Sequence, residues 1–172
     1  MDEPPRTATV EELKALAHPL RWRILRLCAH QELTNRELAD RLDVAPATAL
    51  RHVRALVKHD FLVAQPVRSG ARGALERPYR STRRTWRLGL EDEGEGLVQR
   101  VDLALLAAHR AELLEAGPEA FRDSRRGALR LGPRAQAELS RRLLDLVEEF
   151  SARAEPDGEP LSYLWSLGAR KD

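Results

Sequence analysis

Residues 46–58 carry polar side chains that fall on one side of a predicted helix. Most of them can donate hydrogen bonds or carry positive charge, and the set is Ala47, Thr48, Arg51, His52, Arg54 and Lys58. Apolar residues recur at helical spacing on the opposite side, namely Leu50, Val53, Leu56 and Val57. A guanidinium group can donate two parallel hydrogen bonds to a phosphate or to the edge of guanine. The pattern predicts a helix that packs through one face and presents the other to a polyanion.

Local signals place this helix second in a helix-turn-helix. Thr34 and Glu37 have the spacing of a capping box, which starts a first helix. Pro46 suits the first position of the second helix, and residues 43–45 form the turn between the two. This layout lets the second helix enter the major groove of DNA. Two alternatives are a helical hairpin with a solvated cationic face and a protein–protein interaction module that binds an acidic partner.

The distribution of charge favours a polyanionic partner for the first half of the chain. The net charge of the whole sequence is only +2. Residues 1–90 hold 17 Lys and Arg against 10 Asp and Glu, whereas residues 91–172 hold 12 against 17. A net charge of +7 beside one of −5 in the same small chain indicates nucleic acid as the partner of the first half.

Two predicted strands follow the second helix, at residues 62–68 and 79–88. Residues 69–73 join them in a glycine-flanked loop that carries Arg72, with Arg68 and Arg77 close by. A loop of this kind is typical of the wing of a winged helix, which contacts phosphates or the minor groove. The alternative is a plain hairpin loop.

The remaining helices complete a mainly α fold with a small β wing (α+β). Before the helix-turn-helix we expect a frayed tail at residues 1–8 and helices at 10–17 and 19–30. Residues 94–115 predict a long helix with an apolar stripe, and this stripe must pack against other parts of the protein. We expect it to pack against the first helix and a second subunit. The stripe consists of Leu97, Val98, Val101, Leu105 and Ala108.

The C-terminal part predicts a strand–helix–strand unit. Residues 128–131 form a candidate strand, residues 133–153 a strong amphipathic helix, and residues 161–167 alternate like a strand. We therefore expect a winged helix-turn-helix DNA-binding domain at residues 1–90. Residues 91–172 would form a region for dimerisation and for sensing an effector.

Residues 10–88 resemble the ArsR-type winged-helix transcriptional regulators. The resemblance rests on the segment 16–21 (Leu-Ala-His-Pro-Leu-Arg) and on Thr48, the Arg51-His52 pair, Leu56 and the Leu62-Val63 pair. Ala45 and Leu50 stand where the family has serines, and Asp60-Phe61 replaces its usual glycine-leucine. The resemblance implies a homodimer that binds a near-palindromic operator as a repressor and responds to an effector.

The sequence leaves the effector open. Many members of that family bind metals, but the first helix of the helix-turn-helix has no cysteine, and Asp102, His109 and Glu112 form only half of an interhelical metal site. We therefore predict no metal site. A small-molecule pocket lined by Tyr163, Trp165 and Phe150 is a better candidate than a metal site, although these aromatics also suit a core. A regulator without any ligand is the third option.

Other functional classes fit less well. The chain has no Gly-rich phosphate loop, no paired cysteine or histidine array and no convincing nucleophile–base set, so we predict neither an enzyme nor a cofactor. No apolar run is long enough to cross a membrane, and the N-terminus does not resemble a secretory signal. The single cysteine, Cys28, fits a reducing cytoplasm and is expected to be an inert packing residue.

Overall fold

The computed structural model describes residues 6–70, 73–89, 96–125, 127–155, 157–159 and 161–168. The chain divides into two compact units, Met1–Ala120 and Phe121–Asp172. The first contains every element of the predicted winged helix together with the long helix that follows it. Each unit is described by itself below.

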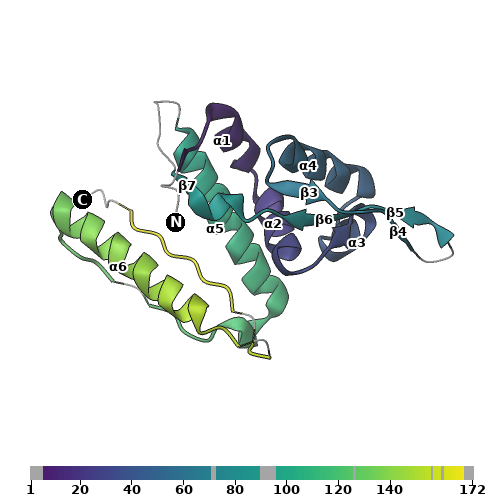
Figure 1. Ribbon diagram of the computed structural model, residues 1–172. Helices are drawn as coiled ribbons and strands as arrows, with labels where there is room; N and C mark the ends of the chain where they lie inside the picture. The colour runs from purple at the N-terminus through teal and green to yellow at the C-terminus, as the bar shows by residue number, and fades with distance from the viewer. Residues whose placement is uncertain are drawn as a thin grey trace. The chain divides into compact units, whose positions relative to one another are not determined.

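Five α-helices form the body of the first unit (Figure 1). They are α1 (Val10–Leu16), α2 (Pro19–His30), α3 (Asn35–Arg41), α4 (Pro46–Lys58) and α5 (Leu97–Ala116). These helices confirm the predicted helical segments to within a few residues. The predicted start of α5 at residues 94–95 lies outside the described part of the chain.

The helix boundaries follow local chemistry. Thr34 caps α3 by accepting a hydrogen bond from the amide of Glu37, whose carboxylate accepts one from the amide of Thr34 at 2.7 Å. Thr9 and Glu12 form an equivalent capping box at α1. Each box satisfies amide groups that the first turn of a helix leaves without partners. The predicted capping box is therefore confirmed, and a second one precedes it.

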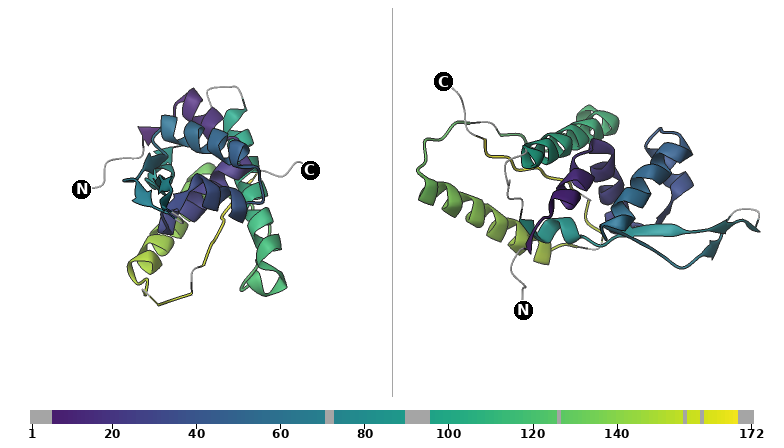
Figure 2. Two further views of the ribbon diagram at one scale, coloured as in Figure 1. Left: turned by 90° about the vertical axis from the view of Figure 1, so that its right-hand side faces the viewer. Right: turned by 90° about the horizontal axis from the view of Figure 1, so that it is seen from above.

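A small antiparallel sheet lies beside the helices. Its strand order is β2 (Leu33–Thr34), β6 (Pro78–Ser81) and β3 (Leu62–Ala64). A separate hairpin, β4 (Arg68–Ser69) paired with β5 (Leu75–Glu76), projects beyond α3 and α4 (Figures 1 and 2). This hairpin is the wing, so the predicted class of a mainly helical fold with a small β wing is confirmed.

The predicted strand at residues 79–88 is too long. The strand ends at Ser81, and Arg83 takes a left-handed conformation with φ 58° before a 3-10 helix, η2 (Arg84–Arg87). The chain then forms β7 (Leu88–Gly89), which pairs in parallel with β1 (Arg6–Thr7). The expectation of a frayed tail through residue 8 is therefore wrong for residues 6–8, because β1 is held by main-chain hydrogen bonds and Ala8 is buried.

One apolar core joins the helices of the first unit. Its largest fully buried side chains include Phe61, Leu16, Ile24, Leu38 and Leu56. Helix α5 adds Leu97 and Val101 to the same core, and it packs against α1 and α2. The long helix is therefore part of the winged-helix body, with α1 covering it as predicted.

In its described part, the second unit contains one long helix, α6 (Pro133–Ala152). The prediction of this helix is confirmed, but no residue of α6 is buried. The predicted strands at 128–131 and 161–167 are wrong, because both segments lack regular structure and pair with no described strand. Alternating apolar residues suit a strand only when a second strand supplies hydrogen bonds.

None of the helices in the described part of the chain is both long and apolar enough to cross a membrane.

Candidate nucleic-acid interface

Helix α4 has one face in the core and one in solvent. Ala49, Val53 and Leu56 are completely buried beneath it. Ala47, Arg51, Arg54 and Lys58 are exposed, and Thr48 is half-buried at the edge of the exposed face. Five of the six candidate residues on this helix thus lie where the sequence predicts, on or beside one outward surface, which we call the recognition face.

The turn between α3 and α4 holds the recognition face in a defined orientation. Asp43 adopts φ 51°, and the amide of Val44 donates to the carbonyl of Ala39 at 3.0 Å. The Asn35 side-chain amide donates to the carbonyl of Pro46 at 3.0 Å, which links the start of α3 to the start of α4. These bonds and the apolar packing of α3 on α4 produce the predicted helix-turn-helix.

His52 is the exception, since its side chain does not face outward. Only 3% of its surface is exposed, and its ring lies 4.3 Å from the ring of His18, centroid to centroid. His52 Nδ1 accepts a hydrogen bond from Nε of Arg21 at 3.3 Å. The expectation that His52 belongs to the exposed face is wrong, because helical spacing leaves it at the boundary between faces and the half-buried Arg21 donates a hydrogen bond to it.

The surroundings of His52 disfavour a positive charge on its ring. Burial, together with the charges of His18, Arg21 and Arg51, lowers the pKa of His52 to about 4. Burial, together with the neighbouring arginines Arg21 and Arg51, also lowers the pKa of His18, whose Nδ1 accepts from the amide of Leu20 at 3.2 Å. Both imidazoles therefore act as neutral acceptors beside guanidinium groups.

The cations of the recognition face differ from those nearby. Arg84 pairs with Glu12 at 3.0 Å and Arg80 lies 3.9 Å from Glu32. Within the described ranges, Arg51, Arg54 and Lys58 form no ion pair, so their charges are not neutralised by carboxylates of the same chain. An exposed cationic surface of this kind attracts a polyanion.

The wing arginines are placed in three different ways. Arg68 lies 3.2 Å from Glu37 of α3 and 3.9 Å from Glu76 of β5, so it ties the wing to the helix-turn-helix. Arg77 is exposed between β5 and β6. Arg72 lies outside the described residues. The two carboxylate partners of Arg68 were not anticipated, although its spacing from Glu76 across a hairpin is a signal that could have indicated one of them.

Sequence reasoning also missed Arg21. Its Nη1 donates to the carbonyls of Lys14 at 3.2 Å and Ala15 at 2.7 Å, while its Nε donates to His52. The side chain thus connects the end of α1 to the recognition helix. The only signal in the sequence is its place in the segment of residues 16–21, which carries the family resemblance.

The candidate sensing residues are scattered. Cys28 is fully buried, and burial raises the pKa of its thiol to about 12. Glu112 is occupied by an ion pair with Arg26 at 2.6 Å. Across the residues that the structure describes, no group of three or more His, Cys, Asp or Glu side chains could hold a metal ion.

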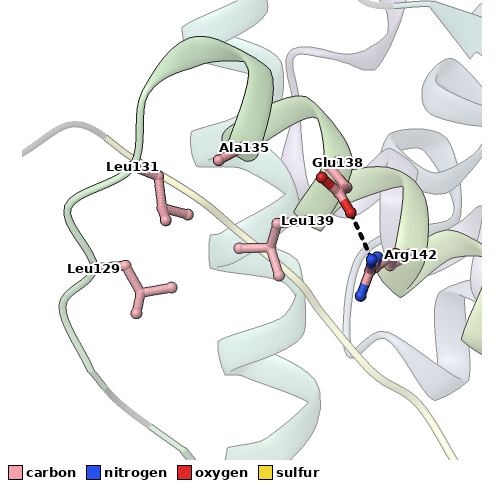
Figure 3. A pocket seen from close by; sticks show the side chains of 6 residues that line it. All are labelled: Leu129, Leu131, Ala135, Glu138, Leu139 and Arg142. Atoms are coloured by element: carbon pink, nitrogen blue, oxygen red, sulfur yellow. Dashed lines mark ion pairs between the residues drawn. The ribbon is translucent and has the colours of Figure 1, made fainter.

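The aromatic candidates for a ligand site are not enclosed. Phe150, Tyr163 and Trp165 are each at least half exposed. The second unit does contain an open hollow of about 240 Å³ beside the first turns of α6 (Figure 3), lined by Leu129, Leu131, Ala135, Glu138, Leu139 and Arg142. Its rim includes the ion pair between Glu138 and Arg142 at 2.6 Å. None of the three aromatics lines this hollow, and the ligand site predicted from them stays a prediction.

Comparisons with known proteins agree with the helix-turn-helix. Residues 16–65 match the family model described as a helix-turn-helix domain. No curated protein matches the chain.

Solved structures similar to the chain include the three that follow. Reduced HlyU from Vibrio cholerae is 20% identical over 59% of this chain and 85% of its own, with a TM-score of 0.36. The transcriptional repressor BigR from Xylella fastidiosa is 19% identical over 60% and 87%, with a TM-score of 0.36. The adhesin competence repressor AdcR from Streptococcus pyogenes is 19% identical over 76% and 78%, with a TM-score of 0.34.

The chain contains a helix-turn-helix domain. Together, the matched domain, the wing and the α4 cations, which pair with no described carboxylate, support a DNA-binding transcription regulator.

The buried His52 predicts a pH-dependent stability. An unfolded chain binds a proton at His52 near its ordinary pKa of about 6.5, whereas the folded chain does so only near pH 4. The free energy of unfolding is therefore expected to decrease as the pH falls through this window, by up to about 1.4 kcal/mol for each pH unit from this residue. Urea denaturation at several pH values measures that slope.

The control for this slope is the His52→Asn variant, which keeps a polar acceptor and removes the titrating ring. It should lose stability less steeply below pH 6.5, whatever its stability at neutral pH. Equal slopes for the two proteins would show that His52 is not buried as a neutral group.

Proposed function

We propose that the chain is a sequence-specific DNA-binding transcriptional regulator of the ArsR type. It acts as a homodimer on a near-palindromic operator and represses the promoter there. The observation that carries this proposal is the recognition face of α4, where Arg51, Arg54 and Lys58 are exposed and no ion pair with a described carboxylate neutralises them. The helix-turn-helix match at residues 16–65 supports the same function.

The proposed contacts divide between base edges and phosphates. Arg51 and Thr48, at the exposed first turns of α4, would read base edges in the major groove, where an arginine pairs with guanine. Arg54 and Lys58 would bind the flanking phosphates. Arg77 and the wing residues Arg68 and Arg72 would contact the backbone beyond them. Because Arg68 already pairs with Glu37, a phosphate would have to compete with that carboxylate.

The proposed dimer uses the outer face of α5. Leu103, Leu106 and Leu114 recur along this helix and are 58%, 41% and 64% exposed. Exposed leucines along one helix are costly in water, and a two-fold axis beside α5 would cover them with the same leucines of a second copy. Two recognition helices would then reach successive major grooves about one helical turn apart. A dimer bound across a promoter blocks access to it, which supports repression.

A regulator of this kind works in the cytoplasm. The second unit, with its open hollow and exposed aromatics, is the part that we assign to further dimer contacts or to a small-molecule effector. A metal-responsive regulator is not favoured, because Glu112 is paired with Arg26.

Substitutions on the recognition face are expected to weaken DNA binding without unfolding the protein. Arg51→Ala should lower the affinity for an operator selected from random-sequence duplexes by about tenfold or more, and Thr48→Ala by less, because each removes a contact to a base. Gel-shift titration measures the affinities. Arg134→Ala, which removes an exposed arginine from α6 in the other unit, is the matched control and should bind like the wild type.

Unchanged affinity in both α4 variants would reject the recognition face. A chain that binds an acidic protein but no duplex would instead support an interaction module.

Disruption of the α5 face is expected to give a monomer. Leu106→Glu places a charge on the proposed two-fold contact, where burial against a second carboxylate is strongly unfavourable. Light scattering at micromolar concentration should report a dimer for the wild type and a monomer for this variant. Leu75→Glu changes an 80% exposed leucine away from α5 and should leave the mass unchanged. A wild-type monomer would contradict the proposed dimer.

A further inference from the structure

Arg21 joins three helices through one side chain. It belongs to α2, its Nη1 donates to the carbonyls of Lys14 and Ala15 at the end of α1, and its Nε donates to His52 of α4. His18, the N-cap of α2, packs its ring against that of His52, with centroids 4.3 Å apart and the ring planes tilted by 48°. Arg21 is half-buried and His52 is almost completely buried. The cluster therefore lies between the recognition helix and the body of the domain.

The cluster differs from the apolar packing of α4 in being directional. Val53 and Leu56 stabilise α4 by burial, which tolerates small rotations of a helix, because apolar contact has no preferred direction. A hydrogen bond weakens steeply when its angle or distance changes. The bond from Arg21 to His52 thus selects one rotation of α4 among those that the apolar core permits.

A small rotation of α4 would matter at the DNA. A group about 6 Å from a helix axis moves by about 2 Å when the helix turns by about 20°. A hydrogen bond to a base edge requires a donor–acceptor distance of about 2.7–3.2 Å, so a displacement of about 2 Å would break it. Arg51 is the immediate neighbour of His52, so its direction is set by the same rotation.

We propose that Arg21 is a positioning residue for DNA recognition, which fixes the orientation of α4 relative to α1 and α5 by donating to His52. Arg21 touches no DNA in this role. Helix α1 packs on α5, so the side chain connects the proposed dimer elements to the reading helix. In the dimer, the rotation of α4 on each subunit sets where the reading side chains of the two subunits meet the base edges, and hence how far apart these contacts lie along the DNA. This part of the inference rests on the proposed function, and it makes Arg21 a determinant of half-site spacing.

The test compares variants that break and restore the bond. His52→Leu removes the acceptor and keeps an apolar volume, whereas His52→Asn places a side-chain oxygen near the position of Nδ1 and can accept from Arg21. Arg21→Met removes the donor and keeps the apolar stem. If Arg21→Met fails to unfold cooperatively, the comparison of His52→Leu with His52→Asn provides the test, because these two variants leave both hydrogen bonds from Arg21 to α1 in place.

The first readout is the preference for operator spacing. An operator is selected from random duplexes with the wild type and then altered by inserting or deleting one or two base pairs at its centre. His52→Leu and Arg21→Met should bind the original operator about tenfold more weakly. They should also discriminate less between spacings, while their affinity for random duplex stays within about twofold of the wild type. His52→Asn should recover the spacing preference, and the double variant should be no worse than either single variant, because the two residues act as one unit.

The second readout needs no DNA. Spin labels at Ala47→Cys on α4 and Gln99→Cys on α5 report the distance between these helices, with labelled chains diluted in unlabelled protein so that only distances within one chain count. The buried Cys28 thiol reacts little under these conditions. The distance distribution should broaden or shift in His52→Leu and Arg21→Met and return in His52→Asn.

The two readouts separate the possible failures. If the wild type selects no DNA sequence, the proposed function fails and the spin-label distances alone decide whether Arg21 positions α4. Wild-type spacing preference and wild-type distances in His52→Leu would overturn the proposal. A parallel loss of operator binding, random-DNA binding and thermal stability would also overturn it, because it would reveal a general structural role.

Discussion

The position of the recognition helix, α4, depends on the apolar contacts along its inner side. Ala49, Val53 and Leu56 are completely buried there, and their burial holds α4 on the body of the domain while its opposite face stays in water. The side chains with which α4 would contact DNA lie on that opposite face. Next to these residues, half-buried Arg21 donates a hydrogen bond to buried His52. This bond is directional, whereas the apolar contacts are not.

The positions of the carboxylates decide which cations of the basic half are available to a phosphate. Glu12 binds Arg6 and Arg84, and Glu37 binds Arg68, so several cations of the basic half serve the fold. Among the described residues, no carboxylate forms an ion pair with Arg51 or Arg54 of α4, so the charges of these two arginines are not neutralised there. A basic half is therefore a coarse indicator of function, and the pairing of individual arginines separates those that hold the domain together from those that are available to a phosphate.

The sequence predicted local features well and distant ones poorly. The capping box of Thr34 and Glu37, the start of α4 at Pro46 and its apolar stripe depend on neighbours within one or two turns, so spacing reveals them. His52 was misplaced because its burial depends on Arg21, 31 residues away. The segment at 161–167 was mistaken for a strand because alternation of Leu161, Tyr163 and Trp165 says nothing about whether a partner strand exists. Arg83, with its left-handed backbone, ended a predicted strand for reasons that no local pattern contains.

The most direct test of the account is the salt dependence of binding to a random-sequence DNA duplex. A cationic face that binds phosphates releases counterions. A plot of the logarithm of the affinity against the logarithm of the salt concentration, between about 50 and 200 mM, should therefore be a falling straight line. Its slope should be roughly −0.9 for each phosphate contacted. Removal of the charge at Arg54 should make the slope shallower by about one contact. An affinity that does not change with salt, or no binding to duplex at low salt, would contradict the assignment of α4 as a DNA-reading helix.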